Sequence, residues 1–309
     1  IGLALALPVG QSIVVGTRQA LTVRFVPTAG ESNIATTISF GDQVIGREMT
    51  DAFAHALPKA EYVNATINLS GRSAAHVIAA NYVGGELAAD SIASAFGSNL
   101  GLTTEHANGT SLPTTLGGTK VKIADSQGQE HTAALFFVSS EQVNYQIPAG
   151  VAEGFATVTI TNRDGLETKG LLQVARVAPG IFSADATGQG FAAGNVVYVR
   201  PDQAQDWHSI TRWDSTNNRS SGNPIDVNGD PAFLILYGTG IRNRSALSSV
   251  KANIDGVETL VEYAGPQGTY ASLDQLNLRL PRSLSGRGEV TVALVIDGKP
   301  TNPVRVLIR

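Results

Sequence analysis

The sequence predicts an all-β protein made of tandem β-sandwich domains, and three observations support this prediction. Charged residues make up 16% of the 309-residue chain, well below the usual ~25%, whereas glycine occurs 33 times. Several short stretches alternate apolar and polar residues, which is the periodicity of strands with one solvated face. An eight-residue segment, EQVNYQIP at 141–148, returns as DQLNLRLP at 274–281. The chain therefore repeats a strand-rich unit.

The length of the chain indicates how many domains it forms. One hydrophobic core rarely serves this many residues, so two or three domains of ~100–150 residues are expected. We predict an N-terminal β-sandwich module at 1–73, a first repeat at 74–183, and a second repeat with an inserted hairpin at 184–309.

The N-terminal module begins with an apolar stretch, IGLALALPVG, which is too short for the ~20 residues of a membrane helix. We interpret it either as the first strand of the module or as a strand that completes the sheet of a neighbouring subunit, donated through Ile1, Leu3, Leu5 and Leu7. The first residue is not Met, which fits a processed, exported chain or an excised fragment.

Two later stretches of the module, 21–25 and 63–69, alternate cleanly and predict strands. Between them, DAFAHALPKA predicts a helical turn that ends near Pro58. After the module, residues 74–95 are rich in alanine, and one or two short helices or 3₁₀ turns are expected there as a connector.

Each repeat contains the eight-residue segment as a core strand that ends at a proline. The buried positions are predicted from the alternation to be Val143, Tyr145 and Ile147 in the first copy, and Leu276, Leu278 and Leu280 in the second. The outward residues are Gln142 and Asn144, then Gln275 and Asn277. We interpret these amides as groups that hold an adjacent loop, with a ligand-binding face as the alternative.

Each repeat also ends in an Asp-Gly pair between two strand-like runs, at 164–165 and 297–298. Positive φ at both central positions suits a type I′ hairpin turn. Four or more strands in ~80–95 residues fit an immunoglobulin-like sandwich better than a closed barrel.

Several stretches resemble one known family, the Solibacter-type C-terminal domain of large secreted proteins from acidobacteria and related bacteria. They include SIASAFGSNL, ALFFVSSEQVNYQIPAG, VAPGIFSA, LILYGTGIRNRS and DGKPTNPVRV, and together with similar stretches they cover most of residues 92–309. The resemblance implies an immunoglobulin-like, secreted, non-enzymatic module in two tandem copies. It brings no catalytic residues with it.

The segment between the copies predicts a hairpin, with 196–200 paired to 208–213 and a loop that includes Pro201 and Trp207. Both tryptophans of the chain, Trp207 and Trp213, lie here. They either cap the core of the second repeat or form aromatic platforms for sugar rings. Exposure of both would favour the platforms, and burial of both would count against them.

Little in the sequence points to catalysis or to a cofactor. The five histidines are scattered without ligand spacing, and each is expected to be a surface or partly packed residue: His55, His76, His106, His131 and His208. Asp226, Asn228 and Asp230 alternate as in a calcium loop, but Gly229 is misplaced and Tyr237 stands where the loop needs glutamate. A turn before the following strand is therefore favoured, and we predict no enzyme, no bound metal and no cofactor.

A net charge of -4 and the lack of a basic cluster argue against nucleic-acid binding. We expect an extracellular or cell-surface bacterial protein without membrane insertion. The first functional hypothesis is a structural protein, either a self-assembling subunit of a surface filament or layer, forming a homo-oligomer or polymer, or a stalk or adhesion segment. The alternative is a carbohydrate- or protein-binding appendage of a secreted protein, with a polysaccharide or cell-surface partner.

Overall fold

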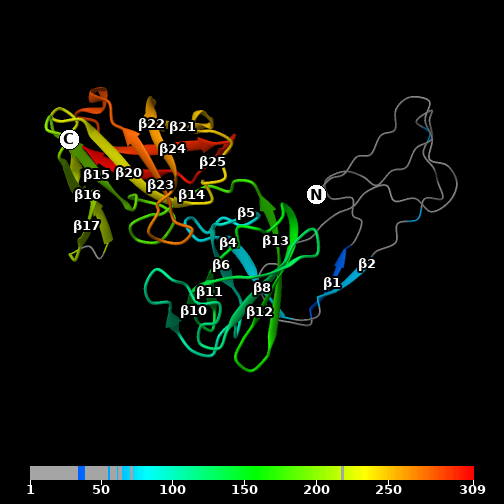
Figure 1. The fold of residues 1–309 in the computed structure, drawn as a ribbon. Helices are drawn as coiled ribbons and strands as arrows, with labels where there is room; N and C mark the ends of the chain where they lie inside the picture. Colours follow the sequence, from blue (N-terminus) through cyan, green and yellow to red (C-terminus); the bar gives the residue numbers. More distant parts are fainter. Residues whose placement is uncertain (1–33, 39–54, 56–60, 62–64, 70–71, 217–218) are drawn as a thin grey trace. The chain divides into compact units, whose positions relative to one another are not determined.

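The computed structural model describes residues 34–38, 55, 61, 65–69, 72–216 and 219–309 (Figure 1). The chain is all-β, as predicted. It divides near residue 71 into two compact units. Strands β1 (Ile34–Ile38) and β2 (Ala65–Leu69) belong to the first unit, and all other described elements belong to the second.

In the first unit, β1 and β2 pair antiparallel, with Ile34 opposite Leu69 and Ile38 opposite Ala65. The strand predicted at 63–69 is thus present at 65–69. The strand predicted at 21–25 and the helical turn before Pro58 lie outside the described residues, as do Ile1, Leu3, Leu5 and Leu7, the predicted donated strand.

The second unit contains two hydrophobic cores enclosed by sheets, and we call the parts around them the first half, residues 72–175, and the second half, residues 176–309. In the first half a five-stranded sheet has the order β4-β6-β11-β10-β7, and a six-stranded sheet has the order β3-β13-β12-β8-β9 with β5 beside β13. Their bounds are β3 Arg72–Ser73, β4 Ala75–Ile78, β5 Glu86–Ala88, β6 Ile92–Phe96, β7 Glu105–His106, β8 Lys120–Ala124, β9 Glu130–Thr132, β10 Leu135–Val138, β11 Gln142–Gln146, β12 Gly154–Thr161 and β13 Glu167–Ala175.

The helices predicted for the alanine-rich stretch 74–95 were wrong, because this stretch forms β4, β5 and β6. The alanines are buried between the sheets: Ala74, Ala80, Ala88, Ala93 and Ala95 are each at most 3% exposed. Packing of small side chains in the sandwich thus overrides the helical preference of alanine.

His76 was expected near the surface and is instead buried in the core of the first half, at 6% exposure. Its Nδ1 lies 2.9 Å from the hydroxyl of the fully buried Tyr145. Its Nε2 is buried without a hydrogen-bond partner and faces Gly170, where a Cβ would come within 2.2 Å. Burial lowers the pKa of His76 from 6.5 to about 4, because charging the ring would cost desolvation.

In the second half one sheet path runs β16-β15-β20-β23-β22-β21-β24-β26-β19, with β14 beside β20 and β25 beside β24, and β17 pairs with β18 separately. The bounds are β14 Gly180–Ile181, β15 Gly194–Val199, β16 Gln205–Ser209, β17 Thr211–Asp214, β18 Arg219–Gly222, β19 Pro224–Ile225, β20 Ala232–Thr239, β21 Val250–Ile254, β22 Val257–Pro266, β23 Asp274–Arg279, β24 Gly288–Ile296, β25 Lys299–Pro300 and β26 Val304–Ile308. Two 3₁₀ turns, η1 (Leu247–Ser249) and η2 (Arg282–Leu284), complete the half. Among the described residues, no helix has the length and apolarity to cross a membrane.

Strand β22 takes part in both layers of the second sandwich. Its N-terminal part pairs with β21, its C-terminal part pairs with β23, and the register with β23 shifts between Val261 and Tyr263. The first half has two separate strands in the corresponding places, since β9 pairs with β8 and β10 pairs with β11. The path therefore folds over on itself to enclose one core.

The eight-residue segment forms β11 in the first half and β23 in the second, as predicted. The predicted inward residues Val143, Tyr145, Ile147, Leu276 and Leu278 are fully buried, and Leu280 is 6% exposed. The outward amides pair along their own strand instead of holding a loop. Gln142 Nε2 donates to Asn144 Oδ1, and Gln275 Nε2 donates to Asn277 Oδ1, both at 2.8 Å.

The two Asp-Gly turns differ from each other. Asp297 and Gly298 have φ of 48° and 81°, as a type I′ turn requires. At the first turn only Gly165 has positive φ, and Asn162 Oδ1 accepts hydrogen bonds from the backbone nitrogens of Asp164 and Leu166. The type I′ prediction was therefore wrong for the first copy, where the asparagine side chain holds a longer turn.

Polar contacts join the two halves at a junction centred on Arg242. Arg242 Nη1 lies 2.7 Å from Asp90 Oδ2, and Arg242 Nε lies 2.7 Å from Asp274 Oδ1. Lys299 Nζ lies 2.5 Å from Glu86 Oε2. Additional hydrogen bonds cross the junction from Asn81 to Asn302, from Ile92 to Thr239, from Asn243 to Ala89 and from Ser272 to Asp90.

Candidate functional site

The candidate site lies in the second half, where the two ends of the folded sheet path approach each other. One end is β16, next to β15, and the other is β19, next to β26. Between them is a pocket of about 600 Å³, which we call the seam pocket. It is lined by Val196, Tyr198, Arg200, Asp206, His208, Ser209, Asn223, Pro224, Ile225, Asp226, Gly229, Asp230 and Arg309.

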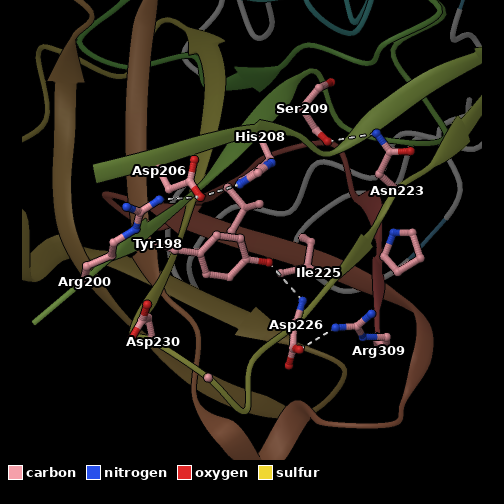
Figure 2. Close-up of a pocket in the computed structure, with 13 residues that line it drawn as sticks. Tyr198, Arg200, Asp206, His208, Ser209, Asn223, Ile225, Asp226, Asp230 and Arg309 are labelled. Atoms are coloured by element: carbon pink, nitrogen blue, oxygen red, sulfur yellow. Dashed lines mark hydrogen bonds and ion pairs between the residues drawn. The ribbon is translucent and has the colours of Figure 1, made fainter. Parts of the chain in front are cut away.

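Two aromatic rings form the centre of the seam pocket. Tyr198 on β15 and His208 on β16 have ring centroids 5.6 Å apart in an edge-to-face arrangement. Tyr198 is partly buried, and its hydroxyl accepts a hydrogen bond from the backbone nitrogen of Asp226 at 3.0 Å. Figure 2 shows the Tyr198 ring between a cluster around Asp206 and the pair formed by Asp226 and Arg309.

The first polar group of the seam pocket is centred on Asp206. Its Oδ2 lies 3.1 Å from His208 Nε2 and 3.3 Å from Arg200 Nη2. The hydrogen bond with His208, followed by that with Arg200, lowers the pKa of Asp206. All three side chains project to the same face of the β15–β16 hairpin as Tyr198, because residues two apart on a strand share a face and Tyr198 pairs with Asp206.

The second polar group is formed by Asp226 and Arg309. Asp226 Oδ1 accepts from the backbone nitrogen of Asn228 at 2.9 Å, and Asp226 Oδ2 lies 2.5 Å from Arg309 Nη2. The hydrogen bond from the Asn228 backbone, followed by the interaction with Arg309, lowers the pKa of Asp226. The Asn228 amide donates to Ser285 Oγ at 2.8 Å. The segment 226–230 thus forms the turn that was the favoured alternative to a calcium loop.

Among the described residues, no group of three or more acidic or histidine side chains is placed to hold a metal ion. Asp226 uses Oδ1 within the turn and Oδ2 toward Arg309, and Asn228 donates its side-chain amide to Ser285. Asp230 lines the seam pocket with an exposed side chain.

Asn223 lines the side of the seam pocket away from Arg200 (Figure 2). Its amide nitrogen donates to the carbonyl oxygens of Ser209 and Thr211, at 2.9 and 3.2 Å. Its Oδ1 accepts from Arg212 Nη1 at 2.9 Å. These bonds tie β16 and β17 to the segment between β18 and β19, so the wall of the pocket is held in place.

A second, smaller hollow of about 340 Å³ adjoins the seam pocket, since both are lined by Gly229 and Asp230. Its other lining residues include Pro231, Arg279 and Arg282. The turn at 226–230 therefore separates two hollows on the same end of the second half.

The predicted hairpin is present, but its details differ from the prediction. Val196 pairs with His208 and Val199 with Gln205, so Trp207 lies within β16 and not in the loop. Trp213 belongs to β17, which pairs with β18 and not with β15. The predicted second strand, 208–213, combines parts of β16 and β17, which the buried Ile210 separates.

Both tryptophans are exposed, Trp207 by 50% and Trp213 by 59%. Exposure was the condition set for aromatic platforms. However, neither tryptophan lines the seam pocket. Trp207 alternates with Asp206 and His208 on β16, so its side chain lies on the other face of the strand. The assignment of Trp207 and Trp213 to a ligand stays a prediction.

The sequence analysis did not predict the seam pocket: it named Asp226 and Asp230 only as calcium-loop candidates and His208 only as a surface or partly packed residue. One signal was available, since Tyr198, Arg200 and His208 lie on one face of the hairpin that the sequence predicts, whereas Asp206 falls in its predicted loop. No local pattern links Asp226 to Arg309, which pair across 83 positions.

Comparison with known proteins found no matching family model and no matching curated protein. Among solved structures, the chain is similar to SGBP-B of a Bacteroides ovatus mixed-linkage glucan utilization locus, determined in complex with a mixed-linkage heptasaccharide. The match covers 96% of this chain and 68% of that chain, at 13% sequence identity and a TM-score of 0.35.

Proposed function

We propose that this chain is a non-enzymatic carbohydrate-binding module of an exported bacterial surface protein, and that the seam pocket holds the sugar. The observation that supports the proposal is the convergence of aromatic and planar polar side chains on a pocket of about 600 Å³. Pockets of ~300–1,000 Å³ with a few placed polar groups are typical ligand sites.

The lining matches the chemistry of a sugar. A pyranose ring presents C–H groups that stack on aromatic rings, and hydroxyls that both donate and accept hydrogen bonds. Tyr198 and His208 supply rings, and Asp206 and Asp226 supply acceptors. The Nδ2 of Asn223 is already used in two hydrogen bonds, so Asn223 adds a further acceptor at Oδ1. The carboxylates are already held by neighbouring side chains, so little conformational entropy is lost when a ligand binds.

The same acids are poorly suited to glycoside cleavage. A glycosidase needs one carboxylic acid that stays protonated near neutral pH, and its pKa is therefore raised. The pKa values of Asp206 and Asp226 are lowered instead. Both groups are ionised, which supports binding without catalysis.

Isothermal titration calorimetry against a panel of soluble polysaccharides tests the proposal. Tyr198→Ala removes the central ring and should weaken binding at least tenfold. Tyr270→Ala is the matched control, because Tyr270 is 58% exposed and does not line the seam pocket. Equal loss in both variants, or no loss in either, would contradict the assignment of the pocket.

A second pair of variants separates the pocket from the tryptophan face. His208→Ala changes the seam pocket, whereas Trp207→Ala changes the opposite face of the same strand. Loss of binding only in Trp207→Ala would move the site to the tryptophans. Incubation of the protein with the bound polysaccharide, followed by analysis of reducing ends, tests for cleavage, and new ends would overturn the non-enzymatic assignment.

The role of stalk or self-assembling surface subunit is a second proposal, supported by the junction around Arg242. Its ion pairs and hydrogen bonds join the two halves through several side chains, as a segment that transmits mechanical force requires. Light scattering and electron microscopy of the full chain test it, with deletion of residues 1–9 as the variant. Polymers that persist unchanged in the deletion would exclude strand donation, and a monomer in the intact chain would exclude self-assembly.

A further inference from the structure

We propose that the seam pocket selects uncharged glycans and disfavours acidic ones, such as uronate or sulfated polysaccharides. This inference rests on the proposed function and adds the chemical class of the ligand. It is carried by the charged groups that line the pocket and by the partners that each of them already has.

Every basic side chain that lines the seam pocket contacts a carboxylate of the same pocket. Arg200 and His208 both contact Asp206, at 3.3 and 3.1 Å. Arg309 contacts Asp226 at 2.5 Å. An anionic sugar would find no unpaired cation here and would have to compete with a resident carboxylate for each one.

One carboxylate remains in excess. Asp230 lines the seam pocket with an exposed side chain, and it has no cationic partner in the described part of the chain. The lining thus carries three carboxylates against two guanidiniums, a formal charge of -1 when His208 is neutral. The lowered pKa values of Asp206 and Asp226 keep both groups ionised at neutral pH.

Uncharged hydroxyls fit this arrangement without displacing any pair. A carboxylate that accepts from Arg or His retains further lone pairs, to which a sugar hydroxyl can donate. An arginine retains further N–H groups, which can donate hydrogen bonds to a hydroxyl oxygen. A sugar carboxylate or sulfate offers only acceptors and meets repulsion from Asp230.

The smaller neighbouring hollow is lined by two further cations, Arg279 and Arg282. Arg279 Nη1 lies 3.9 Å from Glu262 Oε1, so it has an acidic partner. Arg282 Nη2 donates to the carbonyl oxygen of Gly229 at 3.3 Å and has no acidic partner within the described residues. Replacement of Arg282 therefore distinguishes an effect of the smaller hollow from one of the seam pocket.

The test is an array of neutral oligosaccharides printed beside their carboxylated and sulfated counterparts, for example galactan beside polygalacturonate, followed by calorimetry on the best pair. The expected result is that the acidic member binds at least tenfold more weakly than the neutral member. This ratio of the two affinities should become smaller at high salt, because screening weakens the repulsion.

Asp206→Asn frees Arg200 and His208 and should reduce the ratio of the two affinities. Arg282→Gln is the control that should leave this ratio unchanged.

Two results would overturn the inference. Equal or tighter binding of the acidic member by the unaltered protein would refute charge selection, while the proposed function would stand. An absence of binding to both members of every pair would refute the proposed function, and charge selection would fail with it.

Discussion

The burial of His76 predicts that the first half loses stability in mild acid. The unfolded chain binds a proton at this ring near pH 6.5, whereas the folded chain does so only near pH 4. Between these values the unfolded state binds more protons, so the free energy of unfolding falls as the pH falls. This part of the stability is fully present above pH 6.5 and is lost by about pH 4.

The size of the loss follows from the separation of the two pKa values. At 1.36 kcal/mol for each tenfold change in proton affinity, it amounts to about 3 kcal/mol. Asp125 titrates in a lower range. Its hydrogen bond with His131, above all, lowers its pKa from 3.8 to about 2, so its contribution is lost only as the pH falls below 3.8.

The assay is hydrogen exchange of β4, β6 and β11 as a function of pH, corrected for the intrinsic exchange rate, in the unaltered protein and in His76→Asn. The asparagine keeps an acceptor for the Tyr145 hydroxyl but does not titrate. His106→Asn serves as the control, since His106 is exposed. If the unaltered protein and His76→Asn lose protection in parallel between pH 6.5 and 4, the reasoning is refuted.

Three further substitutions test the ion pair at the junction, the close packing around His76 and the second Asp-Gly turn. Arg242→Met leaves Asp274 buried without its partner and should cost about 3–5 kcal/mol; an unchanged urea midpoint would show that the junction is not stabilising. Gly170→Ala places a Cβ 2.2 Å from His76 Nε2 and should cost about 1–3 kcal/mol, with Gly229→Ala, in open space, as the neutral control; equal melting temperatures would contradict the overpacking. Gly298→Ala puts a side chain at a φ of 81° and should cost about 1 kcal/mol in calorimetry; a stabilised variant would exclude the type I′ geometry.

The sequence was most informative where burial alternates along a strand. The eight-residue segment predicted both core strands, because a period of two has one explanation when every second residue is apolar. The positions of Val143 and Leu276 followed directly. The alanine-rich stretch misled because alanine fits both a helix and the tight space between two sheets, and its sequence contains no signal for the sheet that covers it.

The site was less predictable than the fold. Tyr198 and His208 could be placed on one face of a hairpin, but a pocket requires a second wall. That wall comes from Asp226 and Arg309, whose position depends on how the sheet path folds over, and no local pattern encodes this. His76 likewise reads as an ordinary polar residue until its pairing with Tyr145 is known.

Strand β22 has a consequence for how the second half folds. Because its two parts complete different layers, neither layer can be finished while the other is absent. Partial opening of one layer would strip β22 from the other, so the second half should exchange its amide protons as a single cooperative unit. In the first half β9 and β10 are separate strands, so no single strand links the two layers, and their opening should be less tightly coupled than in the second half.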